Sequence, residues 1–149
     1  MRTILLLALA VFGIFSCTKA ETDITEESPE YRGTMTVIYD GEEFVSENVS
    51  VMVGLSEDSA TMDMKMLKVK FVPAMPVRID VLIPGVRVES VSEDGETVVF
   101  SGDGIIPYAL GGEYKKFVVS GLSGKIENGT LSFDLAFGEY PTSYTGYLL

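Results

Sequence analysis

The sequence has no histidine, no tryptophan and a single cysteine, and these absences exclude several classes of function. Without an imidazole there is no His-based acid–base catalysis and no Ser-His-Asp triad, and one cysteine supports neither an intrachain disulfide nor a Cys/His zinc site. Basic residues are also few, 11 against 22 acidic ones, and they form no cluster that would neutralise a phosphate backbone. We therefore expect a protein that is not an enzyme, has no cofactor and does not bind nucleic acid.

The N-terminal segment has the pattern of a secretory signal. Arg2 precedes an apolar run of 12 residues, Ile4 to Phe15, which is shorter than the roughly 20 residues of a transmembrane helix. Ile14-Phe15-Ser16-Cys17 resembles the lipobox of bacterial lipoproteins, whose cysteine becomes the acylated N-terminus; the alternative is a plain signal with an incidental cysteine. We expect residues 1–16 to be a lipoprotein signal peptide and Cys17 to carry the acyl chains, such as palmitate, that anchor the protein to a membrane.

Residues 17–30 have the composition of an acidic, flexible tether. Five acidic residues stand against Lys19, and Ile24 is the only large apolar residue. Removal of residues 1–16 would take away Arg2 and no acidic residue, which leaves a charge of −12, so anionic lipid does not attract the domain. Thr18 is not the aspartate that resembles an inner-membrane retention signal. We expect an outer-membrane lipoprotein and leave open which face it occupies.

From Tyr31 onward the chain has the pattern of β-structure. Apolar residues recur mostly with period two, and Asp40-Gly41, Asp94-Gly95 and Asn128-Gly129 predict tight hairpins. The expected strands cover residues 31–39, 44–55, 61–71, 77–83, 86–92, 97–101, 114–126, 130–137 and 144–149. A change of phase predicts a β-bulge near Met66-Leu67, and residues 102–112 form the longest irregular segment.

These elements predict one all-β domain over residues 31–149. Eight or nine strands bury their edges most completely in a closed antiparallel up-and-down barrel, with a two-sheet β-sandwich as the alternative. Acidic pairs such as Glu42-Glu43 and Glu93-Asp94 fall at expected turns and lack the spacing of an EF-hand. We therefore expect no metal site.

Three motifs carry a resemblance to a family: Tyr31-x-Gly33-x-Met35-x-Val37, Phe100-Ser101-Gly102-Asp103-Gly104, and the stretch from Ser120 to Leu131. They resemble the calycin-like β-barrel lipoproteins of Bacteroides-type bacteria over nearly the whole domain. The resemblance implies a lipocalin-like barrel and a lipid anchor in the cell envelope, and it brings no catalytic residue with it. Asp58-Ser59-Ala60 resembles the acceptor motif for O-glycosylation in such bacteria, which leaves glycosylation of Ser59 open.

The expected strands over 61–71 and 130–137 each carry an apolar stripe on one face, and these two stripes suggest what the barrel interior does. Met62, Met64 and Met66 share one face of a strand, and thioether side chains adapt to irregular apolar ligands. A barrel of eight strands is either filled by its own side chains or holds one small ligand. The first hypothesis is a barrel that binds a small apolar or amphipathic ligand; the alternative is a filled barrel that acts as a structural or protein-interaction module. Under the first, the ligand-lining residues are Met35, Val37, Met62, Met64, Met66, Phe133, Leu135 and Phe137.

Overall fold

The computed structural model describes residues 24–149, and the predicted signal peptide, Cys17 and the first part of the predicted tether lie outside the described residues. The strands are β1 (Glu30–Tyr39), β2 (Glu42–Leu55), β3 (Thr61–Val69), β4 (Ile79–Val91), β5 (Thr97–Gly102), β6 (Tyr108–Ala109), β7 (Gly112–Glu113), β8 (Val119–Glu127), β9 (Thr130–Phe137) and β10 (Tyr140–Leu148). A 3₁₀-helix, η2 (Lys115–Phe117), precedes β8. No helix within residues 24–149 has the length and apolar character needed to span a membrane.

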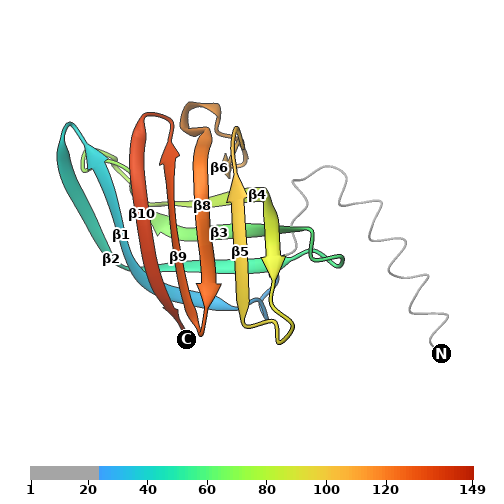
Figure 1. Ribbon diagram of the computed structural model, residues 1–149. Helices are drawn as coiled ribbons and strands as arrows, with labels where there is room; N and C mark the ends of the chain where they lie inside the picture. Colours follow the sequence, from blue (N-terminus) through green and yellow to red (C-terminus); the bar gives the residue numbers. More distant parts are fainter. Residues whose placement is uncertain (1–23) are drawn as a thin grey trace.

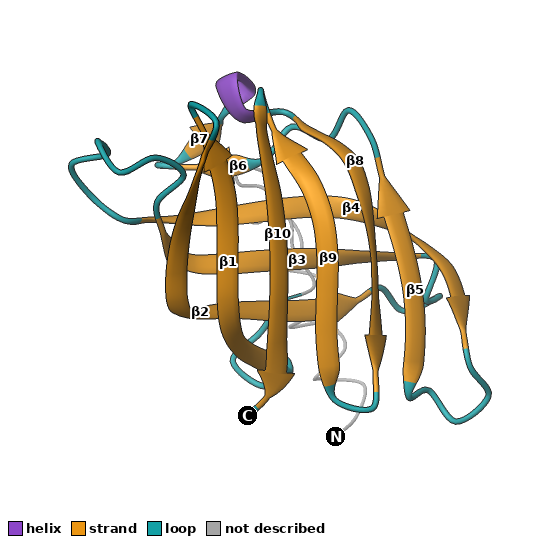
Figure 2. Ribbon diagram, turned by 60° about the vertical axis from the view of Figure 1, so that its left-hand side comes forward, coloured by secondary structure: helices purple, strands orange, loops and turns teal. Residues whose placement is uncertain are grey.

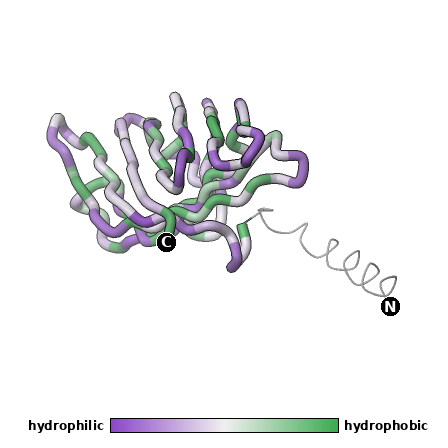
Figure 3. Tube along the Cα trace, turned by 60° about the horizontal axis from the view of Figure 1, so that its bottom comes forward, coloured by the Kyte–Doolittle hydropathy of each residue, from purple (hydrophilic) through white to green (hydrophobic). Residues whose placement is uncertain are grey.

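Eight of these strands close into an antiparallel barrel (Figures 1 and 2). Neighbours along the chain pair from β1 to β5 and from β8 to β10, while β5 pairs with β8 and β10 returns to β1. Hydrophobic and hydrophilic residues alternate along the strands (Figure 3), as expected when one face of each strand is buried. The structure confirms the predicted calycin-like up-and-down barrel rather than a two-sheet sandwich.

The predicted hairpins form where the sequence supplies residues that accept positive φ. Asp40 and Gly41 have φ of 54° and 78°, and Asn128 and Gly129 have φ of 51° and 77°, which is the pattern of type I′ turns. The predicted bulge is also present, because Lys68 has a φ of 54° and the β3–β4 register shifts between Met66 and Val69.

Some predicted boundaries are wrong. The strand expected over 77–83, with its continuation over 86–92, is confirmed as one strand, β4, but its bounds are Ile79–Val91, with Gly85 at a positive φ inside it. The predicted strand over 114–126 begins only at Val119, because the chain first forms η2 and turns Phe117 inward. The last strand starts at Tyr140, since it pairs with β9 directly after the turn. The irregular segment 102–112 contains β6, which pairs with β4 at Leu82, and the start of β7.

The β2–β3 turn, Ser56–Thr61, and the β4–β5 turn, Ser92–Thr97, are built in the same way. In each, a serine hydroxyl donates to the aspartate two residues later, and that carboxylate accepts a backbone N–H two residues further on. The pKa of Asp58 is lowered, chiefly by the backbone N–H of Ala60, and the pKa of Asp94 is lowered, chiefly by the Ser92 hydroxyl. Both turns are therefore held best when their carboxylates are ionised.

We expect these two carboxylates to contribute to the loss of stability in acid. A pKa below the ordinary value of 3.8 stabilises the fold above that pH, and this stabilisation is lost as the pH falls through the lower, folded-state pKa. The double variant Asp58→Asn/Asp94→Asn should therefore show a smaller drop in melting temperature between about pH 5 and about pH 2.5 than the unmodified protein. Circular dichroism melts measure this, with Glu57→Gln as the control. Equal drops in the double variant and the unmodified protein would contradict the assignment.

Candidate functional site

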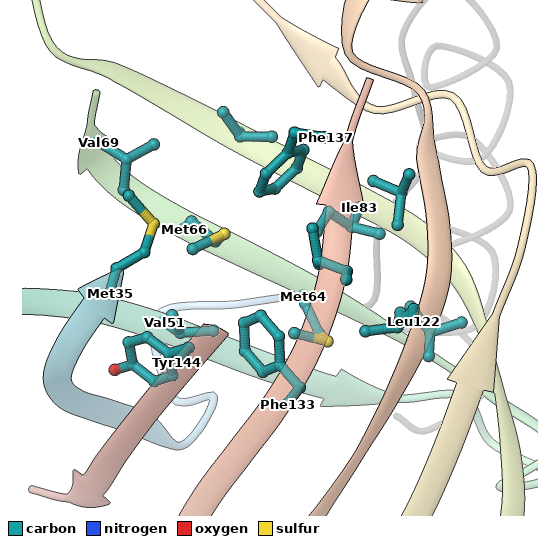
Figure 4. Packing of buried hydrophobic residues seen from close by; sticks show 14 of the residues in the cluster. Met35, Val51, Met64, Met66, Val69, Ile83, Leu122, Phe133, Phe137 and Tyr144 are labelled. Atoms are coloured by element: carbon teal, nitrogen blue, oxygen red, sulfur yellow. The ribbon is translucent and has the colours of Figure 1, made fainter. Parts of the chain in front are cut away.

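The structure brings all eight predicted ligand-lining residues together in the barrel interior (Figure 4 labels several of them). They come from β1, β3 and β9, and they alternate with less buried residues as predicted, except that Asp63, between Met62 and Met64, is also buried. Exposure is 0% for Met35, Val37, Met62, Met64, Met66 and Phe137, 2% for Phe133 and 5% for Leu135. Their role toward a ligand stays a prediction, but their packing is clear.

The six residues with 0% exposure show that the space around them is filled. A void wide enough for a small molecule would leave surface on its walls that a water molecule could touch, and these side chains have none. Figure 4 shows Met64 lying beside Phe133, and Met35 pointing toward Val69 and Met66. Side chains from facing strands thus occupy the centre of the barrel, as they do in the core of a filled barrel.

Aromatic rings fill the room that two glycines leave. The ring of Tyr144 stacks on Phe133 at a centroid distance of 5.2 Å, and its hydroxyl donates to the carbonyl oxygen of Val49 at 2.8 Å. A Cβ at Gly146 would collide with the Tyr144 ring, and one at Gly124 would lie 2.7 Å from Phe100. Burial raises the pKa of the Tyr144 phenol, which therefore remains a neutral hydrogen-bond donor inside the core.

A cluster of rings plugs one end of the barrel. Phe71, from the chain after β3, lies 4.5 Å from Phe137 and 4.7 Å from Phe117 of η2 between ring centroids. Tyr114 and Tyr140 contact Phe117 from the side, at 4.9 Å and 6.0 Å. Figure 2 shows η2 at this end. We call it the plugged end.

Both ends of the described chain lie at the other end of the barrel. The backbone N–H of Leu149 donates to the carbonyl oxygen of Glu30 at 3.0 Å, next to the first residues of β1. Figure 1 shows the C-terminus at the end opposite the β1–β2 and β9–β10 turns. The chain therefore enters the barrel from the side away from the plugged end.

A groove opens on the outside of the barrel near the plugged end. It has a volume of about 450 Å³ and is lined by Phe44–Ser50 of β2 and by Leu67, Lys68 and Arg78. Among residues 24–149, neither Lys68 nor Arg78 takes part in an ion pair. Two other hollows also involve outward-facing residues, one over β5, β8, β9 and β10 and one beside Arg87 and Asp103.

Sequence reasoning did not find this groove. Two of its lining residues, Asn48 and Lys68, have positive φ, 59° and 54°; the phase change near Met66-Leu67 predicted the bulge at Lys68, but nothing in the sequence indicated a groove beside it. Ser59 lies where expected, exposed at the tip of the β2–β3 turn with a φ of 58°. Within residues 24–149, no group of three or more Asp, Glu, His or Cys side chains is placed to hold a metal ion.

Comparison of the chain with protein-family models, with curated proteins and with solved structures gives no significant match.

Proposed function

We propose that the protein is a lipid-anchored protein of the cell envelope whose filled barrel is a rigid platform for contact with another protein. The observation that carries this proposal is the 0% exposure of the six interior residues from Met35 to Phe137. A ligand-binding barrel keeps an interior space for its ligand, whereas this interior is occupied by methionine and aromatic side chains. The outer surface is then the part of the domain available for recognition.

The position of the chain ends supports an anchored platform. If Cys17 carries the anchor, the tether joins the barrel at Glu30, at the end opposite the plugged end. The groove on β2 and the loops around the plugged end then face away from the membrane. More than one acyl chain on the cysteine would make the attachment stable rather than transient.

The anchor is tested with the full chain in a bacterium that processes lipoproteins. We expect the unmodified protein to incorporate labelled palmitate and to fractionate with the outer membrane, and Cys17→Ser to do neither. Ser16→Ala, which keeps a small residue before the cysteine, is the matched control and should behave like the unmodified protein. Unmodified protein that fractionates with the outer membrane without incorporating palmitate would contradict the proposed lipid anchor at Cys17.

The platform is tested by placing a photo-crosslinking amino acid at outward positions in intact cells. Val45 samples the groove, Ser132 the outer hollow over β9, and Glu57 the β2–β3 turn. We expect one protein partner to be crosslinked repeatedly from at least one of these positions. Mass spectrometry of the gently purified, then denatured protein should find no stoichiometric small molecule. A bound small molecule and no crosslink from any position would overturn the platform in favour of interior ligand binding.

A further inference from the structure

Half of one edge of β2 has no strand beside it. On one side, β2 pairs with β1 over most of its length, from Glu42 to Met52. On the other side, its pairing with β3 covers only Ser50 to Leu55. The bulge at Lys68 causes this, because it turns the chain inward so that Phe71 reaches the ring cluster of the plugged end. Closing that end thus leaves the first part of β2, beginning at Glu42, as a free edge.

The register identifies the backbone groups on this free edge. In an antiparallel pair, the residues that flank a two-residue hairpin loop are hydrogen-bonded to each other, and bonded positions then alternate. Tyr39 pairs with Glu42 and Val37 with Phe44, so Glu42 and Phe44 direct their backbone groups toward β1. Glu43 and Val45 direct theirs toward the groove. Each carries one donor and one acceptor, and such a row of free groups is a template for another strand.

The free edge ends against basic residues. A strand added beside Val45 would lie in line with β3, so it must stop where Leu67 pairs with Ser50. Lys68 follows Leu67 directly, with its backbone N–H donating to the Asp80 carboxylate at 2.9 Å, and Arg78 lines the same groove together with Glu47. In a chain with 22 acidic and 11 basic residues, two cations without an ion pair among the described residues favour a carboxylate at this closed end.

We propose that this edge binds the C-terminal segment of a partner protein as an added strand, parallel to β2, with the partner's α-carboxylate between Lys68 and Arg78. The hydrogen bonds to Glu43 and Val45 supply affinity that depends little on sequence, and the outward Val45 side chain, 48% exposed, selects an apolar neighbour. A chain terminus fits because the free edge ends where Leu67 pairs with Ser50, so a bound chain could not continue past that point.

A second copy of the chain fits this edge poorly. Antiparallel pairing of two β2 edges centred on Val45 would set Glu43 of each copy opposite Glu47 of the other, and like charges directly opposite are destabilising. Each copy also carries a net charge of −11 over the whole sequence. A partner strand that ends in a carboxylate beside Lys68 and Arg78 avoids the repulsion between Glu43 and Glu47.

The inference rests on the proposed platform function and is tested with the full-length lipoprotein in detergent micelles. The probe is a random peptide library displayed with free C-termini, selected against the unmodified protein and, in parallel, against Val45→Pro. Proline at position 45 removes an edge donor without removing a β1–β2 hydrogen bond, so the barrel should still fold. We expect peptides to be enriched on the unmodified protein and on the control Val45→Thr, but not on Val45→Pro.

The enriched peptides are then synthesised as free acids and as C-terminal amides, and binding is measured by fluorescence anisotropy. We expect at least tenfold weaker binding for the amide, and for the free acid on Lys68→Ala/Arg78→Ala. Circular dichroism melts check that each variant is folded. Equal binding of acid and amide, or equal enrichment on Val45→Pro, would overturn the inference.

Absence of any enriched peptide would also overturn it. The proposed platform would still stand if crosslinks formed from Ser132 or Glu57, so the two failures are distinguishable.

Discussion

Met64→Glu is expected to abolish folding of the barrel. Met64 lies at the centre of β3 with 0% exposure, beside Phe133 and across the ladder from Val53 and Ile83. Removing its side chain alone, as alanine, would cost about 2–5 kcal/mol. Glutamate adds an unpaired buried charge, whose effective cost is several kcal/mol more. Since a domain of this size has a total stability of about 5–15 kcal/mol, the sum removes most or all of it.

The measurement is a far-UV circular dichroism spectrum with a thermal melt, and Lys65→Glu is the matched control. Lys65 is the next residue on β3 and points to the outer face, so the same carboxylate there should shift stability by about 0.5 kcal/mol or less. A cooperative melt of Met64→Glu close to that of the unmodified protein would show that the interior accepts a charge and water. That result would restore the ligand-binding hypothesis for the methionine face.

Gly33→Ala is expected to destabilise the ladder that closes the barrel. Gly33 on β1 lies directly opposite Gly146 on β10. A Cβ at position 33 would collide with the carbonyl oxygen of Thr145 and with the backbone of Gly146. Backbone cannot rotate away as a flexible side chain can, so the two strands must separate locally. We expect a loss of about 3 kcal/mol, at the upper end of the cost of overpacking, and a fall in melting temperature of roughly 10 °C.

Gly112→Ala is the control for this substitution. A Cβ at Gly112 meets nothing within 4 Å, and the residue has no positive φ, so its melting temperature should change little. Urea unfolding followed by fluorescence or circular dichroism gives both free energies. If Gly33→Ala were as stable as Gly112→Ala, the close approach of β1 and β10 would be wrong.

The parts of the fold that the sequence predicts correctly are those set by local chemistry. The alternating stripe of β9 and the Asn128-Gly129 turn before it gave its exact bounds, Thr130–Phe137. The inward face of Met62, Met64 and Met66 follows from the period of two. Each of these features is contained in a few consecutive residues, so a single sequence reveals it.

The parts that the sequence does not predict depend on contacts between distant residues. Residues 115–117 leave the strand pattern because Phe117 reaches Phe71, which lies in the connection between β3 and β4. The free edge of β2 likewise results from where β3 turns, which no feature of residues 42–48 announces. The interior residues of the candidate site were therefore predictable, whereas the external groove was not.

The arrangement of the chain ends determines how the domain carries mechanical load. β1 begins at Glu30, where the tether of the proposed lipid anchor would enter, and it lies between β2 and β10 with long antiparallel ladders on both sides. If the protein is anchored through Cys17 and binds a partner on β2 as proposed, a pull between membrane and partner would act along the strand axis of β1. Such a force shears the hydrogen bonds of both ladders together instead of peeling them apart one at a time. The strand that would follow the tether is therefore hydrogen-bonded to a neighbour on each side. This suits a domain that is attached to a membrane at one end and binds a partner near the other, as proposed.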